Sequence, residues 1–478
     1  MCGIVLLSGP NASTRIETTL SRLHHRGPDD RVVWCAGQTA LGFARLAING
    51  DAEEGRQPHQ HGRLRGVVNG EIYNHRALTQ AEGLPPSASD TAVVLPLVAR
   101  MGPRAIDALD GFYAAVVLEE GGHEALCLRD HMGKKPLFVG RSSGEVFITS
   151  ELKVLDAIEW FERLPRGAAV VDLQTGRVRA VATHRRQGPD LDLRAAFEHA
   201  VVKRVPTSPQ PVGLFLSGGL DSSLVAAFAS RCRDDITYFT LGDPTGPDGR
   251  AVDAVVHALG LKDVRRVSLP SPAELPGLIR AVVRATESFN PSIVSNGLAT
   301  YLLAKAAHDA GIKVVLTGEG ADELFGGYHS LQPHEPWRHI RERLIDDMQF
   351  TELRRLDLSC MAHSVEPRCP FLDRAVRAIS DRLGYADLYH EGENKVALRR
   401  TFRGVLPAEI LHRRKTSFDV GSGMRGAVVR HLRQAGGTER DALRRVWTQL
   451  FPFDASAPHF SAYPTFDAAI DRRGEGHR

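Results

Sequence analysis

The hydrophobic pattern divides the chain into two parts. In the first part, short apolar runs are separated by turn residues, and these runs lie at residues 4–7, 64–68, 114–118, 147–149 and 168–172. This spacing predicts a β-rich domain of packed sheets. Helices are expected in the same part around residues 16–23 and around residues 91–101.

The second part begins after residues 184–190, which carry no apolar pattern. Beyond them, apolar strand-like runs alternate with alanine-rich helical stretches, which indicates an α/β domain with a parallel sheet. We therefore expect one domain over residues 2–184 and another over residues 192–430. A C-terminal tail over residues 431–478 mixes arginine, proline and scattered aromatic residues, and the pattern predicts no role for it.

Length and composition restrict the class of protein. A chain of 478 residues is long enough for two or three domains. The 60 basic and 57 acidic residues nearly cancel, so charge gives no reason to expect binding to nucleic acid or to an acidic membrane surface. No apolar stretch reaches the roughly 18 residues of a membrane span, and we see no signal-peptide pattern. The six cysteines are scattered without a CxxC pair, so we expect a cytoplasmic protein.

Cys2 is a candidate nucleophile. If Met1 is removed, Cys2 carries both a thiol and a free α-amine, and an amine with a pKa of about 8 can take the proton of the thiol. Hydrolysis of the side-chain amide of glutamine needs a nucleophile, an oxyanion hole, a cation for the α-carboxylate and an anion for the α-ammonium. Later segments supply the other three groups.

In this interpretation Asn69 and the amide of Gly70 form the oxyanion hole. Glutamine is bound by Arg45 at its α-carboxylate, by Glu71 with Asp90 at its α-ammonium, and by Asn69. The alternative is that Asn69 and Gly70 form only a hairpin turn and that Arg45 is a surface charge. Together with the segment at residues 25–30, this set resembles the N-terminal-nucleophile glutaminase domain of the asparagine synthetase family.

A second motif covers residues 213–223, where an apolar strand runs into two glycines and hydroxyl residues before a helix. Such a loop lets backbone amides and a helix N-terminus approach a phosphate. It lacks the Gly-Lys-[Ser/Thr] ending of a Walker A loop. It resembles the pyrophosphate-binding loop of enzymes that cleave ATP between its α- and β-phosphates; the alternative is a glycine-rich turn without a ligand. The expected ATP-binding residues are Leu216, Ser217, Gly218, Gly219, Asp221 and Ser222.

A second strand, loop and helix follow at residues 313–328 and place Gly318 and several carboxylates past the end of a strand. Asp221 and Asp322 are natural ligands for the Mg²⁺ that accompanies ATP. Glu319 is expected near the reacting carbonyl, where it would accept a proton from ammonia. Capping of the helix by Asp322 is a further role, and it does not exclude the metal.

Two later segments extend the resemblance. Residues 365–373 resemble the Val-Glu-x-Arg-x-Pro-Phe-Leu-Asp signature of asparagine synthetases, and residues 413–418 resemble the lysine-bearing segment that follows it. Lys415 then supplies the cation that offsets charge on the α-phosphate and on departing pyrophosphate, and it contacts ATP. Without this context, Lys415 would be interpreted as a solvated charge.

The resemblance to the asparagine synthetase family covers about residues 2–425. It implies an N-terminal-nucleophile hydrolase αββα sandwich followed by a parallel α/β domain similar to adenine nucleotide α-hydrolases. It also implies a ligase that hydrolyses glutamine, adenylates a substrate carboxylate with ATP and Mg²⁺, and carries ammonia through an internal tunnel to form a carboxamide. Family relatives are commonly dimers, so a homodimer is consistent with the resemblance.

The acceptor acid is the open question at this stage. Asparagine-forming members carry a Tyr-Asp-Val-Thr-Thr-Ile-Arg segment, and the matching residues 289–295 place Ser295 at the arginine position. Because an arginine pairs strongly with a carboxylate, its replacement favours a small carboxylic acid other than aspartate. The alternatives are aspartate itself, an intramolecular cyclase of the β-lactam synthetase or lasso-peptide type, and a decayed non-catalytic protein.

Overall fold

The computed structural model describes residues 2–50, 53–185, 191–207, 209–328, 337–434 and 436–462. The chain forms two compact units: residues 1–186 with 451–453, and residues 187–450 with 454–478. The described residues do not include Met1, residues 186–190 of the expected break, or the end of the expected tail. No described helix combines the length and apolar character that a membrane-crossing segment requires.

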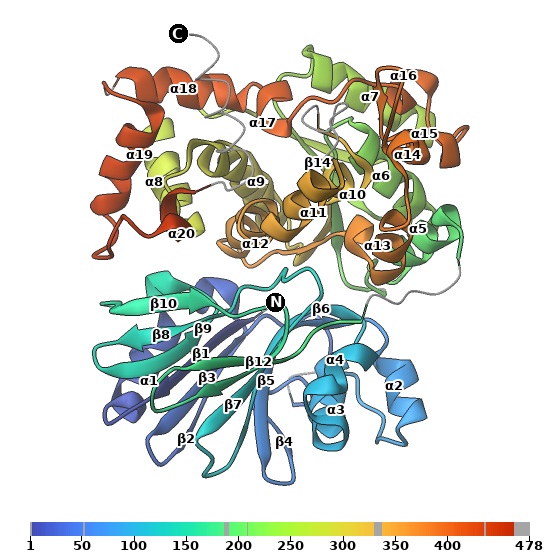
Figure 1. Ribbon diagram of the computed structural model, residues 1–478. Coiled ribbons are helices and arrows are strands. Elements are labelled where there is room, and N and C mark those ends of the chain that lie inside the picture. The colour runs from blue at the N-terminus through green and yellow to red at the C-terminus, as the bar shows by residue number, and fades with distance from the viewer. Residues whose placement is uncertain are drawn as a thin grey trace. The chain divides into compact units, whose positions relative to one another are not determined.

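The first unit contains two six-stranded antiparallel sheets (Figure 1). The first sheet has the order β10 (Trp160–Arg163), β8 (Phe138–Ser142), β9 (Glu145–Thr149), β1 (Gly3–Ser8), β3 (Thr39–Arg45) and β2 (Asp30–Ala36). The second sheet has the order β12 (Val178–Ala182), β11 (Gly167–Asp172), β7 (Glu124–Arg129), β6 (Gly111–Glu119), β5 (Leu64–Ile72) and β4 (His59–His61). Both sheets are largely apolar on their facing sides, which explains why they pack.

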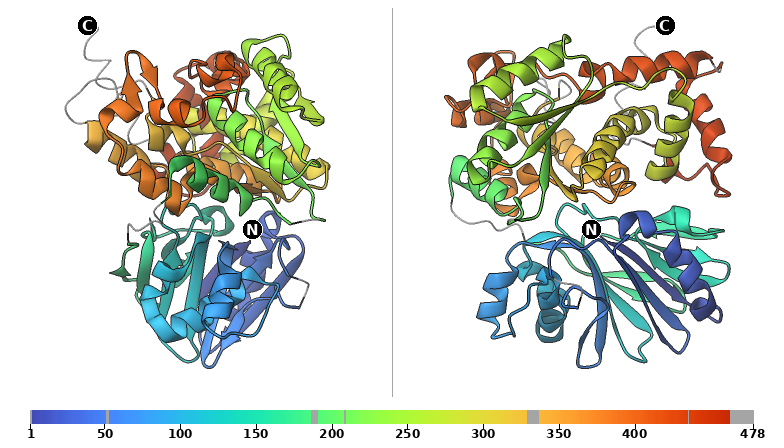
Figure 2. Two further views of the ribbon diagram at one scale, coloured as in Figure 1. Left: turned by 90° about the vertical axis from the view of Figure 1, so that its right-hand side faces the viewer. Right: turned by 180° about the vertical axis from the view of Figure 1, so that it is seen from behind.

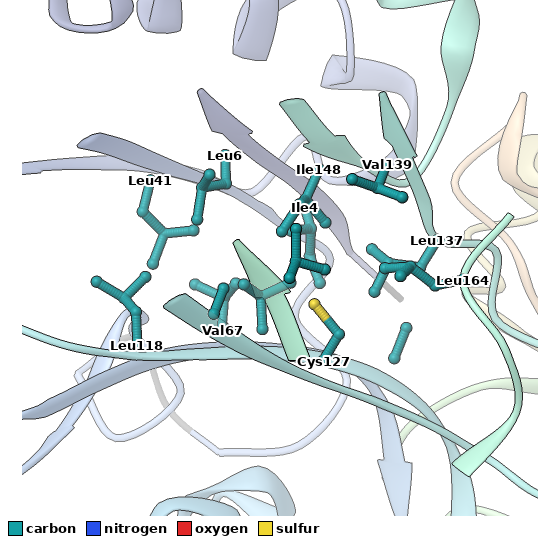
Figure 3. Packing of buried hydrophobic residues seen from close by; sticks show 14 of the residues in the cluster. Ile4, Leu6, Leu41, Val67, Leu118, Cys127, Leu137, Val139, Ile148 and Leu164 are labelled. Carbon is teal, nitrogen blue, oxygen red and sulfur yellow. The ribbon is translucent and has the colours of Figure 1, made fainter. Parts of the chain in front are cut away.

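The main core of this unit lies between the two sheets (Figure 3). Ile4 and Leu41 of one sheet meet Val67 and Cys127 of the other, and all four are almost completely buried. Outside this core, α1 (Ala12–Ser21) packs on β1 and β3, and α3 (Val94–Met101) packs on β5. Two shorter helices, α2 (His75–Ala81) and α4 (Ala105–Ala108), complete the second helical layer. The predicted αββα sandwich is confirmed.

The second unit is built on a five-stranded parallel sheet. Its order is β15 (Asp263–Val267), β14 (Thr237–Leu241), β13 (Val212–Phe215), β16 (Val314–Leu316) and β17 (Glu366–Arg368). In Figures 1 and 2, helices flank this sheet on both sides. They include α5 (Leu193–Val202), α6 (Leu220–Cys232), α7 (Pro247–Leu259), α8 (Leu275–Thr286), α9 (Pro291–Asp309), α12 (Glu352–Met361) and α13 (Arg374–Ser380). The predicted parallel α/β domain is confirmed.

Further elements belong to this unit. They are α10 (Ala321–Phe325), α11 (Trp337–Asp347), α14 (Tyr385–Leu388), β18 (Tyr389–His390), β19 (Glu393–Asn394), α15 (Val396–Thr401), α16 (Ala408–Leu411), α17 (Phe418–Gly421), α18 (Met424–Gln434), α19 (Glu439–Thr448) and α20 (Pro458–Ser461). The hairpin β18–β19 leads directly into Lys395, a buried residue with a positive φ of 54°.

Local sequence fixes the start of α9, the helix that borders the larger cavity described below. The Asn290 side-chain oxygen accepts hydrogen bonds from the N–H groups of Ser292 (2.9 Å) and Ile293 (3.3 Å). Pro291 occupies the first helical position, where a missing N–H is not needed. The sequence Asn-Pro-Ser therefore begins this helix at one defined residue.

The described part of the tail anchors the segment before α9. The backbone N–H of Phe289 donates to the carbonyl of Phe460 (2.9 Å), and the Asn290 side-chain amide donates to the carbonyl of Ser461 (3.0 Å). Buried Arg354 donates to the Thr286 carbonyl (2.8 Å) and also to the carbonyl of His459. Residues 459–461 thus hold in place the loop that leads into α9.

Replacement of Arg354 by alanine should destabilise the second unit. Buried Arg354 donates to the carbonyls of Thr286, Glu287 and His459, and its replacement removes all of these hydrogen bonds together with the packing of the side chain. We expect a decrease of about 2–4 kcal/mol in the free energy of unfolding, measured by chemical denaturation. The exposed Arg280→Ala variant is the control, and equal stabilities of the two variants would contradict this account.

Candidate functional site

Cys2 immediately precedes β1 and is 8% exposed. Its backbone nitrogen donates to Asn69 Oδ1 (2.9 Å), and its carbonyl accepts a hydrogen bond from Arg26 Nε (3.0 Å). Because Asn69 lies on β5 and Cys2 adjoins β1, the site joins one strand from each sheet. The nucleophile candidate is therefore held through its main chain.

A buried ionic cluster supports this main-chain contact. The Glu151 carboxylate binds Arg26 Nη1 (2.7 Å), His25 Nε2 (2.8 Å) and Lys153 Nζ (2.7 Å). Burial opposes ionisation of Glu151, but the nearby Lys153, His25 and Arg26 outweigh it and hold the pKa of Glu151 well below its ordinary value. Sequence reasoning missed Glu151, because one glutamate far along the chain carries no signal of its partners.

Asn69 carries a side-chain donor that is available for the predicted oxyanion hole. Its side chain is fully buried, and within the described residues its Nδ2 has no hydrogen-bond partner. Asn69 and Gly70 lie inside β5 (Leu64–Ile72), so the hairpin-turn interpretation is wrong. A Cβ at Gly70 would come within 2.1 Å of the Phe112 carbonyl oxygen, so only glycine fits there.

The other predicted glutamine-binding residues line one small cavity together with Cys2. Arg45, Gly70, Glu71 and Asp90 all contribute to its wall. Arg45 Nη2 donates to the Asn49 carbonyl (3.3 Å) and to the Gly50 carbonyl (3.2 Å). The cavity therefore combines a thiol, a cation, two carboxylates and the backbone of Gly70, which suits recognition and hydrolysis of glutamine once an oxyanion donor is supplied as well.

Neighbouring residues hold these groups in place. The Asn49 side-chain amide donates to the Glu71 carboxylate, and Asp90 Oδ2 accepts from the Ile72 N–H (2.7 Å). A Cβ at Gly55 would lie 1.9 Å from Arg45 Nη2, so Gly55 makes room for the guanidinium. Sequence reasoning missed Asn49 and Gly55, which resemble ordinary loop residues.

The phosphate-loop motif follows β13 and leads into α6. Ser217 Oγ lies 3.0 Å from Ser222 Oγ, and the Ser217 N–H donates to the same Ser222 oxygen (3.1 Å). Gly218 has a φ of 69°, and a Cβ there would come within 2.7 Å of the Val252 nitrogen. Leu216 is buried behind the loop, whereas Ser217, Gly219, Asp221 and Ser222 line cavities.

The second predicted loop lies directly beside the first. Strands β13 and β16 are parallel neighbours, with Leu214 opposite Leu316, so both loops begin at the same edge of the sheet. A Cβ at Gly318 would lie 2.7 Å from the Ser222 nitrogen, which shows how closely the loops approach. Ser217, Asp221, Gly318, Glu319, Asp322 and Lys415 line one cavity of about 560 Å³.

Two lysines pair with the two aspartates of this cavity. Lys395 Nζ lies 2.6 Å from both Asp221 Oδ2 and Asp322 Oδ1, and Lys415 Nζ lies 2.5 Å from Asp322 Oδ2. Burial opposes ionisation of Asp322, but Lys395 and Lys415 hold its pKa below its ordinary value. Burial raises the pKa of Asp221, with Lys395 acting in the opposite direction. Sequence reasoning predicted Lys415 and missed Lys395.

The pair Asp221 and Asp322 also fits a divalent cation. Oxygens of both carboxylates lie 2.6 Å from one atom, Lys395 Nζ, so the two side chains converge on a common point. Mg²⁺ takes oxygen ligands and commonly uses one or two carboxylates together with substrate phosphates. Within the described residues no cluster of three or more histidine, cysteine or acidic side chains forms a metal site. Such a cation would therefore need phosphate or water oxygens as well.

Glu319 lies in the same cavity, and Arg355 Nη2 holds its carboxylate at 2.8 Å. A second carboxylate, Glu352, also lines the cavity and accepts a hydrogen bond from Thr351 Oγ1. Burial and the nearby Glu319 raise the pKa of Glu352 to about 7, against the effect of Thr351. Sequence reasoning chose Glu319 as the proton acceptor and missed Glu352, which titrates near neutral pH.

Comparisons with known proteins match the two parts of the chain to two family models. The family model described as a glutamine amidotransferase domain matches residues 1–181, and the one described as asparagine synthase matches residues 192–349 and 332–451. Asparagine synthetase B [glutamine-hydrolyzing] of Escherichia coli (strain K12) is 31% identical over 442 residues, which cover 84% of this chain and 78% of that protein. The asparagine synthetase [glutamine-hydrolyzing] of Triphysaria versicolor is 31% identical over 465 residues, which cover 88% and 78%.

Among solved structures, a glutamine phosphoribosylpyrophosphate amidotransferase from B. subtilis complexed with ADP and GMP covers 56% of this chain and 81% of that chain. Its sequence identity is 15% and its TM-score is 0.34, so the two chains are only distantly similar.

Replacement of Asn69 by alanine should slow glutamine hydrolysis without weakening glutamine binding to the same degree. The variant loses a donor aimed at the developing oxyanion, so kcat should fall by about 10²–10³-fold while KM changes little. The measurement is steady-state release of glutamate. Asn11→Ala, an exposed position before α1, is the control. A normal kcat for Asn69→Ala would contradict the role.

Replacement of Glu352 by glutamine should change the pH dependence of the ATP-dependent reaction. A base with a pKa of about 7 is protonated and inactive below that pH and becomes active above it. The rate of the variant divided by that of the wild type should therefore fall as pH rises from 6 to 8. Exposed Glu409→Gln is the matched control. A ratio that is constant with pH would exclude Glu352 as the base.

Proposed function

The chain belongs to the glutamine-hydrolysing asparagine synthetase family, and from that premise we propose that it converts a small carboxylic acid other than aspartate into its carboxamide. The family assignment makes the chain a carbon–nitrogen ligase that uses glutamine and an ATP-utilising domain. The acceptor, the roles of individual residues and the use of Mg²⁺ belong to the proposal. So do the domain limits at residues 184, 192 and 430.

In the first reaction, the Cys2 thiolate attacks the side-chain carbonyl of glutamine. The side chain of Asn69 and the N–H of Gly70 donate to the oxyanion, while Arg45 and the Glu71–Asp90 pair hold the amino-acid end. Ammonia leaves, and water then hydrolyses the γ-glutamyl thioester to release glutamate. The supporting observations are that Cys2, Arg45, Gly70, Glu71 and Asp90 share one cavity wall, and that Asn69, which accepts from the Cys2 N–H, has a buried Nδ2 without a described partner.

In the second reaction, the acceptor carboxylate attacks the α-phosphorus of ATP, and pyrophosphate leaves. The loop at residues 217–222 binds the phosphates, and Lys415 offsets the charge on the α-phosphate and pyrophosphate. Ammonia then attacks the acyl-adenylate, Glu352 or Glu319 accepts a proton, and AMP leaves. Asp221 and Asp322 would hold Mg²⁺, which when bound neutralises phosphate charge. The observation that carries the proposal is the convergence of both loops and Lys415 on the 560 Å³ cavity.

Synthesis of asparagine from aspartate is the second candidate function. It is favoured by the names of the curated relatives, which are asparagine synthetases at 31% identity. Against it, Ser295 is buried and donates a hydrogen bond to Asp419 (2.7 Å), so this position supplies a hydroxyl and a carboxylate rather than a cation. An intramolecular cyclase is disfavoured because Cys2, Arg45, Gly70, Glu71 and Asp90, the residues proposed for glutamine hydrolysis, line one cavity together.

The proposal is tested by measuring pyrophosphate release in the presence of ATP, Mg²⁺ and glutamine. The measurement is made with and without aspartate. We expect no dependence on aspartate in a preparation that still hydrolyses glutamine. Strong dependence on aspartate with formation of asparagine would instead establish the second candidate function.

The Cys2→Ala variant tests the division of labour between the two reactions. It should lose glutamine-dependent synthesis and keep ammonia-dependent synthesis, because only the first reaction needs the thiol. Cys35→Ala, an exposed cysteine on β2, is the control. Full glutamine-dependent activity of Cys2→Ala would show that Cys2 is not the nucleophile.

A further inference from the structure

The cavity that contains the phosphate loop is also lined by residues outside the predicted motifs. These residues come from α9, α12, α17 and α18, and they include Asn296, Thr300, Glu352, Arg355, Asp419 and Arg425. Because the acceptor carboxylate must reach the α-phosphate, this part of the wall is available to bind the rest of the acceptor. Its charges therefore indicate what kind of acid fits.

The basic side chains in this wall already pair with acidic ones. Lys415 pairs with Asp322 at 2.5 Å, Arg355 pairs with Glu319 at 2.8 Å, and Arg425 pairs with Glu439 at 2.9 Å. An acceptor with a second carboxylate would have to compete with one of these acids for its cation. Such competition weakens binding because the displaced acid then loses its own partner.

Asp419 is different from the other acids of the wall. It is 4% exposed, and its Oδ2 accepts a hydrogen bond from Ser295 Oγ at 2.7 Å. Among the described residues no basic side chain forms an ion pair with it. A buried carboxylate that is satisfied by a single hydroxyl is costly unless a cation or further donors reach it. In this cavity a bound substrate can supply them.

The position of Asp419 is fixed by its surroundings. Asp419 lies on α17, and a Cβ at Gly421 in that helix would lie 2.0 Å from Asp248 Oδ2. Asp248 is held in turn by Arg413 at 2.5 Å. The carboxylate of Asp419 is therefore presented to the cavity by a segment that has little room to move.

We propose that Asp419 recognises the acceptor by binding an ammonium group, so that the acceptor is an amino acid whose only carboxylate is the one that reacts. This inference rests on the proposed function, because it assigns the acceptor of the same adenylating site. Adenylation joins that carboxylate to AMP with release of pyrophosphate, and ammonia then displaces AMP to give an aminoalkyl carboxamide. The ammonium group takes no part in bond formation and serves recognition only.

The test compares three sets of acids in ATP-dependent pyrophosphate release, with the full chain and saturating ammonia. The first set is 3-aminopropanoate, 4-aminobutanoate and 5-aminopentanoate. The second set replaces the ammonium group with methyl: butanoate, pentanoate and hexanoate. The third set contains the dicarboxylates succinate, glutarate and aspartate. We expect release with at least one member of the first set, at a kcat/KM roughly ten- to a hundredfold above that of its methyl counterpart.

Variants of Asp419 separate recognition from folding. Asp419→Asn should remove the preference for the ammonium group, while Asp419→Glu keeps the charge and should retain a preference. Asp309→Asn, an exposed aspartate at the end of α9 that pairs with Lys305, is the matched control and should keep the wild-type preference. The thermal unfolding midpoints of all variants show whether each is folded.

Two kinds of failure can be told apart. Three outcomes would overturn the inference and leave the proposed activation of an acid intact. They are equal release with the first and second sets, release only with dicarboxylates, and a preference for the ammonium group that survives in folded Asp419→Asn. Absence of release with every acid of all three sets would overturn the proposed function and the inference together.

Discussion

The larger unit depends on how two lysines and two aspartates share charge at the carboxyl ends of β13 and β16. Lys395 contacts both Asp221 and Asp322, and Lys415 contacts Asp322. Charges buried at this depth are tolerated only when they are paired. Under the proposed function, phosphate oxygens of ATP would replace carboxylate oxygens on the lysines, and the aspartates would then be available to a divalent cation.

In the smaller unit, the proposed nucleophile and the proposed oxyanion donor lie on or beside regular strands. Cys2 adjoins β1 and Asn69 lies within β5, so the hydrogen bond between them joins the two sheets. Strands packed on a common core move little relative to one another, which would keep such a donor aligned. Two glycines also keep this site in place. A side chain at Gly55 would displace the Arg45 guanidinium, and a side chain at Gly70 would displace the neighbouring strand at Phe112.

Sequence predicted the fold class and a set of charged and polar residues that line the two cavities, because many of those residues occur in short motifs at or near the ends of strands. The strand-loop-helix at residues 213–223 can be located by its local pattern alone. Glu151, Glu352 and Lys395 could not be found in this way, because only the fold brings Glu151 to Arg26, Glu352 to Glu319 and Lys395 to Asp221. Lys395 lies 174 residues from Asp221, and its segment resembles any charged turn. Asp419 was missed for the same reason, since only the fold brings it to Ser295.

The proposed function requires that ATP activate the acceptor carboxylate as an acyl-adenylate, which glutamine-derived ammonia then converts to an amide. The decisive experiment is isotope transfer with the acid that supports pyrophosphate release, whose carboxylate is labelled with ¹⁸O. Attack of that carboxylate on the α-phosphorus and later loss of AMP must leave one labelled oxygen in AMP. We predict ¹⁸O in AMP and none in pyrophosphate. Label in inorganic phosphate with formation of ADP, or amide formation with unlabelled AMP, would contradict the account.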